Sequence, residues 1–271
     1  MLLASMGFEA LATTSGGFAA TLGRLDGSVT RHEALAHAES IVGATDLPVS
    51  ADLENCFSDS PAGVAETVER AIETGLAGCS VEDFTGRTAE PIYEPGLAVE
   101  RVAAAAERAH RDGGRFVLTA RAENYLHGRR DLGDTISRLR AYEEAGADVL
   151  YAPGLASLEE VRQVVESVNR PVNVLAMPGG PTVADLAGVG VRRISVGGAF
   201  AFAALGAVVD AARELLDHGT YQFWAQAGRG RTAPRLRSTA DGAQRIPRPP
   251  RPTPSSSTPA ATCPIFHCFI N

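Results

Sequence analysis

Short apolar runs rich in β-branched residues alternate with longer stretches of helical period along most of the chain. A parallel strand covered on both faces produces such a run, and each helix between two strands needs only one apolar stripe. The runs span residues 10–14, 48–52, 78–82, 115–121, 149–152, 171–175 and 193–196. This alternation predicts an α/β fold in which a parallel sheet is wrapped in helices.

The stretches between these runs predict helices over residues 30–44, 60–74, 97–112, 131–145, 157–168, 183–186 and 200–218. Gly75 and Gly146 follow two of them as C-caps, and Ser157 with Glu160 forms a capping box. Seven βα units with short connectors, and no GxGxxG after a strand, favour a (β/α)8 TIM-type barrel over a doubly wound sheet. Residues 1–14 are typical of the second half of a helix followed by a strand. We therefore expect a barrel that lacks its first strand.

Composition changes near residue 225 of the 271-residue chain. Residues 226–271 hold seven Arg against one Asp, and eight of the 16 Pro, although the whole chain has a formal charge of -7. Proline has no amide donor, so this stretch favours neither helix nor central strand. We predict a barrel domain over residues 1–225 and a disordered Arg/Pro-rich tail over 226–271. No aromatic residue is interleaved with the tail arginines, so we do not expect nucleic-acid binding.

Lysine is absent, and all 25 basic residues are arginine. This excludes Schiff-base aldolases, pyridoxal-phosphate enzymes and phosphate-loop NTPases, because each needs a lysine amine at the reacting centre. The four Cys are scattered and form no CxxC pair, which predicts neither a disulfide framework nor a zinc site and indicates a reducing cytoplasm. No segment reaches the ~20 consecutive apolar residues of a membrane helix. We therefore expect a cytoplasmic protein without a membrane span.

Polar side chains cluster where successive predicted strands end. In a barrel of this kind, the loops at those ends open onto one face, where functional residues gather. Several carboxylates on one face need a compensating cation, and ligation by oxygen alone suits Mg²⁺ or Mn²⁺. An arginine there offers a planar clamp for an anionic ligand, and a Ser-Gly-Gly turn offers a hydroxyl and unobstructed amides. The cluster consists of Ser15, Gly16, Gly17, Asp52, Glu54, Asn55, Glu82, Asp83, Arg121, Glu123 and Asn124.

Each of these features has a simpler interpretation when taken alone. Asp52 and Glu54 follow an apolar run, where acidic residues commonly cap the next helix. Glu82 with Asp83 is equally ambiguous, and Arg121 could form a salt bridge at the end of the barrel. Their coincidence at successive strand ends favours a functional site.

The segments ALATTSGGFAA, PVSADLEN, GCSVEDF, FVLTARAEN, PVNVLA and RISVGGA follow one another along residues 1–225. Together they resemble the isocitrate lyase/phosphoenolpyruvate mutase superfamily, specifically its short bacterial branch of phosphonomutase-like and 2-methylisocitrate lyase-like proteins. The resemblance implies a Mg²⁺-dependent (or Mn²⁺-dependent) enzyme that acts on a small 2-oxo or 2-hydroxy acid. It would make or break a C–C or P–C bond through an enolate-like intermediate, as a phosphonomutase or an oxaloacetate decarboxylase does. It also implies a homo-oligomer, with the helix over 200–218 at the interface.

The resemblance also assigns roles to individual residues. Asp52 would be the direct metal ligand, with Glu54 and Glu82 bound to the metal through water. Ser15, Gly16 and Gly17 are similar to the turn that grips the substrate carboxylate. Asp26 resembles the catalytic acid that follows this turn, and Arg121 resembles the catalytic clamp on the substrate.

The chain departs from the superfamily at one informative position. Its lyases carry adjacent Lys, Cys, Gly and His in the loop after the Glu-Asp strand, whereas residues 84–90 here read FTGRTAE. Cleavage that needs the thiol of that loop, such as isocitrate or methylisocitrate lysis, is therefore disfavoured. The absent loop and the absent first strand leave an alternative open. In this alternative, the chain is a non-catalytic truncated barrel that binds an acid ligand or a partner without turnover.

Overall fold

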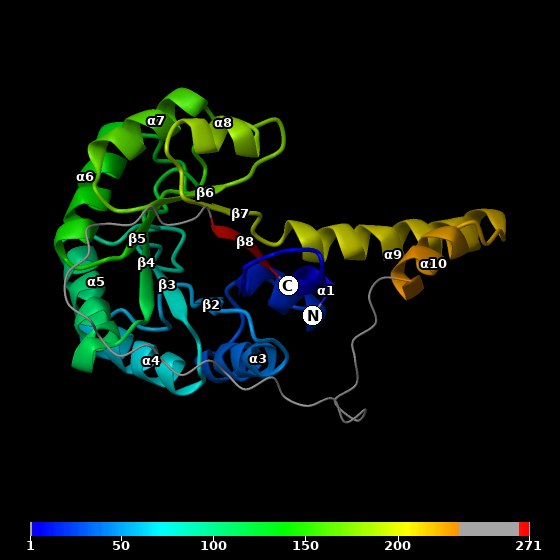
Figure 1. The fold of residues 1–271 in the computed structure, drawn as a ribbon, viewed down its shortest axis with the longest axis horizontal. Coiled ribbons are helices and arrows are strands. Elements are labelled where there is room, and N and C mark those ends of the chain that lie inside the picture. Colours follow the sequence, from blue (N-terminus) through cyan, green and yellow to red (C-terminus); the bar gives the residue numbers. More distant parts are fainter. Residues whose placement is uncertain (1, 233–265, 271) are drawn as a thin grey trace.

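Eight parallel strands form a closed barrel in the order β1 to β8 (Figure 1). The structure is a computed structural model that describes residues 2–232 and 266–270. Each strand pairs with its neighbour in sequence, and β8 pairs with both β7 and β1. The strands are β1 (Ala10–Ala12), β2 (Val49–Asp52), β3 (Gly78–Glu82), β4 (Val117–Arg121), β5 (Val149–Tyr151), β6 (Val172–Leu175), β7 (Arg193–Ser195) and β8 (Phe266–Ile270).

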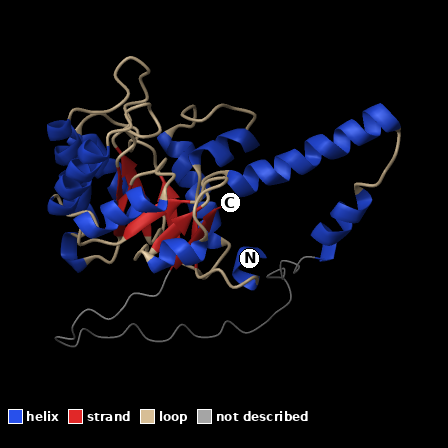
Figure 2. Cartoon of the chain, turned by 90° about the horizontal axis from the view of Figure 1, so that it is seen from above, coloured by secondary structure: helices blue, strands red, loops and turns tan. Residues whose placement is uncertain are grey.

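Helices cover the outside of the barrel (Figure 2). The helices are α1 (Leu2–Ser5), α2 (Ser15–Thr21), α3 (Arg31–Gly43), α4 (Pro61–Glu73), α5 (Pro95–Ala109), α6 (Leu132–Glu144), α7 (Leu158–Ser167), α8 (Val183–Gly188), α9 (Ala199–His218) and α10 (Trp224–Thr232). A single turn of 3₁₀-helix spans Arg111–Gly113. Capping boxes begin α3, α7 and α8, so residues adjacent in the sequence determine where these helices begin.

The two faces of the strands have different residues. On β2, Val49 and Ala51 are buried beneath the helices, whereas Ser50 and Asp52 are only partly buried. Residues that point to one face of a strand recur every second position, so Ser50 and Asp52 share the barrel interior. The apolar core therefore lies between sheet and helices, and the interior of the barrel is free to hold polar groups.

The predicted barrel class is confirmed. All seven apolar runs are strands within a residue or two of the expected bounds, and the seven expected helices form. Gly75 and Gly146 have φ of +85° and +103°, the left-handed geometry that suits glycine after a helix. The sequence did not predict α2, because Gly16 and Gly17 favour a turn. Thr14 caps this helix by accepting a hydrogen bond from the amide of Gly17.

The position expected for a missing strand is filled by the other end of the chain. Residues 266–270 form β8, in register with Ala10–Ala12 on one side and with Arg193 and Ile194 on the other. The predicted tail over 226–271 thus includes strand β8 and, through Thr232, most of α10. An apolar segment gains backbone partners in the gap between two strand edges, and this long-range pairing leaves no local signal. For residues 233–265 and 271, which lie outside the described residues, disorder stays a prediction.

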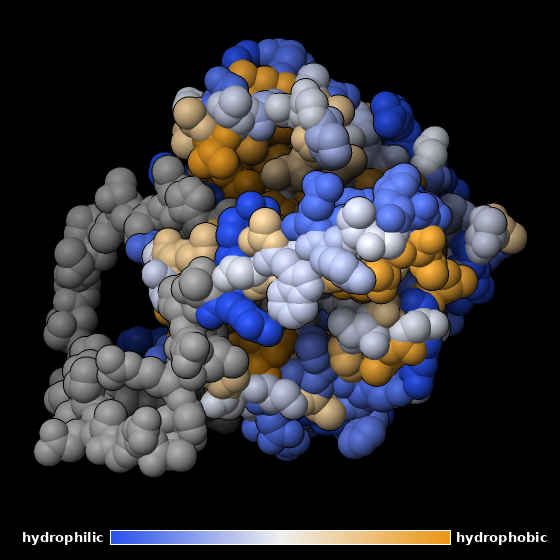
Figure 3. All heavy atoms as spheres, turned by 90° about the vertical axis from the view of Figure 1, so that its right-hand side faces the viewer, coloured by the Kyte–Doolittle hydropathy of each residue, from blue (hydrophilic) through white to orange (hydrophobic). Residues whose placement is uncertain are grey.

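Helix α9 projects away from the barrel (Figures 1 and 2). None of its residues is buried, and hydrophobic side chains show on the face of the molecule from which it extends (Figure 3). Seven large apolar side chains of this helix are each more than 40% exposed. They are Phe200, Phe202, Leu205, Val208, Val209, Leu215 and Leu216.

Among the described residues, no helix has both the length and the apolar character needed to cross a lipid bilayer.

Removing β8 should lower the stability of the barrel. We expect deletion of residues 262–271 to reduce the free energy of unfolding by about 2 kcal/mol or more, because each lost backbone hydrogen bond contributes about 0.5–1.5 kcal/mol and two strand edges become exposed. Urea denaturation followed by circular dichroism measures this difference. Deletion of residues 253–258, which keeps β8, is the control. Equal stability of the parent and the 262–271 deletion would contradict closure by β8.

Candidate active site

A cavity of about 350 Å³ opens at the carboxyl ends of the strands. Its wall includes the first turn of α2, the loop that carries Asp26, and the ends of several strands. Asp52 and Arg121 both line it. The strand ends therefore bring together side chains that are far apart in the sequence, as the barrel topology requires.

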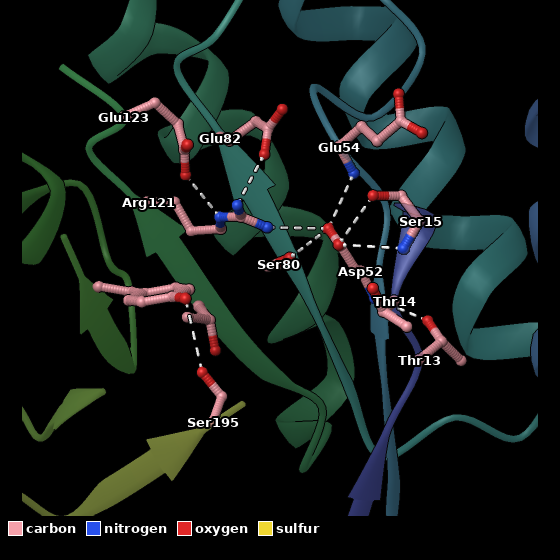
Figure 4. Close-up of polar contacts among 12 residues, drawn as sticks. Thr13, Thr14, Ser15, Asp52, Glu54, Ser80, Glu82, Arg121, Glu123 and Ser195 are labelled. Atoms are coloured by element: carbon pink, nitrogen blue, oxygen red, sulfur yellow. Dashed lines mark hydrogen bonds and ion pairs between the residues drawn. The ribbon is translucent and has the colours of Figure 1, made fainter. Parts of the chain in front are cut away.

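Arg121 lies at the centre of a cluster of carboxylates (Figure 4). Its Nη1 lies 2.9 Å from Asp52 Oδ1, its Nη2 lies 3.2 Å from Glu82 Oε2, and its Nε lies 2.7 Å from Glu123 Oε1. The Arg121 side chain is only 14% exposed, and Glu82 and Glu123 are buried. All three nitrogens of the guanidinium are thus engaged by carboxylates from β2, β3 and the end of β4.

The carboxylates of the cluster outnumber its cation. Burial raises the pKa of Glu82 well above its ordinary value, and the negative charge of Glu123 adds to this, although Arg121 opposes it. Burial likewise raises the pKa of Glu123. Burial lowers the pKa of Arg121, but the three carboxylates outweigh this and hold it well above its ordinary value. The site therefore has more negative charge than Arg121 alone can balance.

Hydroxyl groups hold Asp52 in place at the edge of the cavity. Ser15 donates to Asp52 Oδ2 through its backbone N at 3.2 Å and its Oγ at 3.1 Å, and Ser80 Oγ donates to Oδ1 at 3.4 Å. The backbone N of Asp52 donates to Thr13 Oγ1 at 2.9 Å. Ser15 thus joins the first turn of α2 to the end of β2, a contact that the sequence did not predict.

Glu54 follows Asp52 in a tight turn with φ of +51°, a left-handed conformation that is uncommon outside glycine. Its Oε1 is buried and has no hydrogen-bond partner among the described residues. Burial raises the pKa of Glu54 to about 7, and the negative charges of Asp52 and Asp26 add to the effect. The positive charge of Arg121 opposes this rise in the pKa of Glu54 but does not outweigh it.

The other predicted site residues also lie at this mouth. A Cβ on Gly16 would lie 3.1 Å from Asp26 Oδ2, so glycine there allows the Asp26 carboxylate to approach α2. A Cβ on Gly17 would lie only 2.4 Å from the Thr14 side chain, so glycine is needed there for the cap. Asp26 itself is exposed and lines the cavity. The structure thus places every predicted site residue at the mouth of the barrel, with Arg121 in contact with carboxylates.

Asp83 and Glu123, two of the polar residues expected at the strand ends, belong to a buried network behind Arg121 that the sequence did not predict. Asp83 is 2% exposed, and its Oδ2 accepts a hydrogen bond from Tyr142 at 2.6 Å and contacts Arg138 Nη1 at 3.2 Å. The other oxygen, Oδ1, accepts from the backbone N of Glu123 at 2.7 Å. This contact fixes the residue that holds Arg121 Nε. No local pattern links Asp83 to α6, which supplies both Arg138 and Tyr142, so only the fold reveals the network.

The polar interior below the mouth was also not predicted from the sequence. Its members line the cavity from alternate strand positions, and the period-two placement of small polar residues in otherwise apolar runs was the available signal. They are Ser80, Thr119, Tyr151, Asn173 and Ser195.

The charge of the mouth fits a divalent cation. No three or more His, Cys, Asp or Glu side chains in the described residues are grouped closely enough to ligate one ion. Mg²⁺ usually keeps several waters and uses one or two carboxylates, so it does not need such a group. The orphaned Oε1 of Glu54 and the raised pKa of Glu82 both indicate uncompensated negative charge beside Asp52. Asp52 as a direct ligand, with Glu54 and Glu82 bridged by water, is compatible with this arrangement.

Comparisons with known proteins point to one family. Residues 1–216 match the family model described as phosphoenolpyruvate phosphomutase. The chain is 31% identical over 181 residues to 2-methylisocitrate lyase of Escherichia coli. The matched region covers 64% of this chain and 60% of that enzyme. It is 50% identical to a Burkholderia cenocepacia protein to which a lyase or mutase activity has been ascribed, with a TM-score of 0.80 and 87% of each chain covered. The chain is 28% identical to oxaloacetate acetylhydrolase, whose structure in complex with oxalate matches this one with a TM-score of 0.72. The match covers 80% of this chain and 77% of that chain.

Replacing Glu54 by Gln should stabilise the metal-free protein at neutral and higher pH. An unfolded Glu loses its proton near pH 4.5, whereas folded Glu54 keeps it up to about pH 7. The folded state therefore binds more protons in this window, and Glu54 makes the free energy of unfolding fall as pH rises through it. We expect Glu54→Gln to melt a few degrees higher than the parent above pH 7 and to match it below pH 4.5.

Calorimetry in the presence of a chelator measures these melting temperatures. Glu107→Gln, an exposed position on α5, is the control and should follow the parent at every pH. If Glu54→Gln melts at the same temperature as the parent above pH 7, the raised pKa of Glu54 is contradicted.

Proposed function

The chain belongs to the phosphoenolpyruvate phosphomutase family, and on this premise we propose that it makes or breaks a C–C or P–C bond of a small 2-oxo or 2-hydroxy acid. One observation supports this above the others. Three carboxylates, two of them buried, contact the guanidinium of Arg121 at the mouth of a cavity large enough for such an acid. A site of this charge favours a bound cation and, with it, an anionic ligand.

The cation in this proposal is Mg²⁺ or Mn²⁺. Asp52 would bind it directly, and Glu54 and Glu82 would bind it through water. Such an ion supplies positive charge to an oxyanion that develops on the substrate.

The residues around Asp52 would orient the acid. Arg121 Nη1 contacts Asp52 and its Nη2 contacts Glu82, so the second N–H of each nitrogen would contact the enolate-like oxygen while Glu123 holds Nε. The turn formed by Ser15, Gly16 and Gly17 would bind the substrate carboxylate. Because both donors of Ser15 already reach Asp52, this turn also fixes the direction of the Asp52 carboxylate.

Asp26 is the candidate group for moving a proton. It lines the cavity beside Gly16 and is exposed, so it can exchange protons with solvent. Its carboxylate faces the same space as the proposed substrate.

Thiol chemistry is disfavoured at this site. Residues 84–90 contain no Cys, His or Lys, and a hydrogen bond of 2.6 Å from Thr85 Oγ1 to the carbonyl of Glu90 closes this loop on itself. Burial raises the pKa of Cys56 to about 12 and that of Cys79 well above its ordinary value. Both thiols therefore stay protonated. This favours phosphonomutase-like or oxaloacetate-decarboxylase-like chemistry over isocitrate or methylisocitrate lysis.

A turnover assay separates this proposal from the alternative of a non-catalytic barrel. The purified chain with Mg²⁺ is incubated with a panel of 2-oxo and 2-hydroxy acids, including oxaloacetate and a 3-phosphono 2-oxo acid, and products are followed by NMR. Turnover of at least one acid that stops in the presence of a chelator is expected. Metal-dependent binding of acids without any turnover would favour the non-catalytic barrel.

Asp52→Asn should weaken Mg²⁺-dependent binding of oxalate, an enolate mimic. The substitution keeps the shape of the side chain and removes its charge, so we expect affinity to fall by about thirtyfold, which corresponds to about 2 kcal/mol. Isothermal titration with and without Mg²⁺ measures this change. Asp46→Asn, exposed in the loop before β2, should bind oxalate as the parent does. If Asp52→Asn also bound like the parent, the assignment of Asp52 as the ligand would be wrong.

We further propose that α9 joins copies of this chain into a homo-oligomer. The helix projects from the barrel with no buried residue and carries seven exposed large apolar side chains. An exposed apolar surface on a projecting element favours association. A second copy of the chain offers the same surface, so a symmetric pairing would cover both helices.

Charges on α9 should dissociate the oligomer. Leu205 and Val209 lie one helical turn apart, so a Leu205→Glu and Val209→Glu double variant places two carboxylates on one apolar face. Sedimentation velocity should show the parent as an oligomer and the double variant as a monomer. Asp210→Ser, on the same helix, should leave the oligomer intact. A monomeric parent at all concentrations would rule this proposal out.

A further inference from the structure

The cavity continues below Asp52 and Arg121 into the barrel. The interior of such a barrel is ordinarily filled by bulky branched side chains. Here polar side chains of β3, β4, β6 and β7 line the 350 Å³ cavity, beside Leu175 at the end of β6 and Arg193 at the start of β7. The cavity therefore has a polar floor, which we define as Tyr151, Asn173 and Ser195.

A chain of hydrogen bonds joins these three residues. Asn173 Nδ2 donates to Ser195 Oγ at 3.1 Å, and Ser195 Oγ donates to the hydroxyl of Tyr151 at 3.4 Å, a contact drawn at Ser195 in Figure 4. All three residues are buried: the exposed fraction is 2% for Asn173, 6% for Ser195 and 9% for Tyr151. The donors run in one direction, so the chain ends at Tyr151, whose own proton is not used within it.

Two hydrogen-bonding groups of the polar floor remain for a ligand. Asn173 Oδ1 is buried and has no hydrogen-bond partner among the described residues. The Tyr151 hydroxyl lines the same cavity and accepts from Ser195, so it can donate its proton. Leaving a buried acceptor without a partner is unfavourable. A group that both donates and accepts would satisfy the two ends of the chain.

The polar floor is also in contact with the proposed reaction centre. The guanidinium carbon of Arg121 lies 5.2 Å from the centre of the Tyr151 ring, within the range of a cation–π interaction. A ligand held at Arg121 would thus extend directly towards the floor.

The size of the cavity agrees with a ligand longer than oxalate. If each heavy atom takes roughly the ~30 Å³ of a water molecule, oxalate would fill only about half of the 350 Å³. The rest has room for a short carbon chain with one further polar group.

We propose that the polar floor recognises a hydroxyl group on the part of the substrate remote from its 2-oxo acid end. This inference rests on the proposed function and names the substrate class as hydroxylated 2-oxo acids. The hydroxyl oxygen accepts from Tyr151, and its proton is donated to Asn173 Oδ1. Oxalate, which is too short to reach the floor, reports on the mouth of the cavity alone.

Matched pairs of acids test this recognition. 2-Oxobutanoate and 2-oxopentanoate are compared with their terminal hydroxy derivatives as competitors of oxalate, by isothermal titration in the presence of Mg²⁺. For the parent chain, we expect one hydroxylated acid to bind about tenfold more tightly than its partner, which corresponds to about 1.4 kcal/mol. Asn173→Leu and Tyr151→Phe should each reduce this ratio to near one while oxalate affinity stays within about twofold.

Further variants separate recognition from general damage. Asn173→Asp keeps an acceptor and should keep a preference for the hydroxyl. Ser50→Ala removes a different hydroxyl from the cavity wall and should leave the ratio unchanged. If Asn173→Leu fails to fold by circular dichroism, Tyr151→Phe carries the test, since it removes only one oxygen.

The outcomes distinguish the inference from the function on which it rests. Loss of Mg²⁺-dependent oxalate binding by the parent would overturn the proposed function and this inference with it. Oxalate binding with equal affinities within each pair would overturn the inference alone and would indicate that water occupies the floor. A hydroxyl preference that survives both Asn173→Leu and Tyr151→Phe would overturn it as well.

Discussion

The ion pairs of Arg121 with Asp52, Glu82 and Glu123 are the interaction on which the architecture of the mouth depends. They connect β2, β3 and β4 at one end of the barrel, where backbone pairing alone would leave four charged groups desolvated. Burying a charge costs several kcal/mol unless partners compensate it. Arg121 compensates part of the negative charge, and the remainder gives the site its chemical character.

The uncompensated part of the charge links stability to function. Glu54, Glu82 and Glu123 all have raised pKa values because burial and neighbouring carboxylates disfavour their ionised forms. A fold optimised only for stability would replace such groups with apolar ones. Retaining them costs stability, and the proposed cation would reduce that cost by balancing their charge. The network of Asp83, Arg138 and Tyr142 supports this arrangement from behind.

The interior of the barrel and its outside surface follow different requirements. Apolar residues between the sheet and the helices stabilise the barrel, so the inward positions of the strands are released from packing. These positions carry the polar floor, in which the buried acceptor Asn173 Oδ1 has no hydrogen-bond partner among the described residues. On the outside, α9 leaves apolar side chains exposed that the barrel itself cannot cover. The proposed ligand site and the proposed interface adjoin at Phe202, which lies on α9 and lines the cavity.

The sequence by itself determined the barrel class, the positions of its first seven strands and the side chains that gather at its mouth. Short-range patterns predict these properties: apolar runs, capping residues, and polar residues where a run ends. The tertiary structure decided what those patterns cannot encode. Arg121 turned out to bind three carboxylates, Asn173 to join Ser195 and Tyr151, and residues 266–270 to pair with β1. Each of these contacts joins residues that are far apart in the sequence. They meet because the barrel closes, so the local sequence around either residue does not predict the contact.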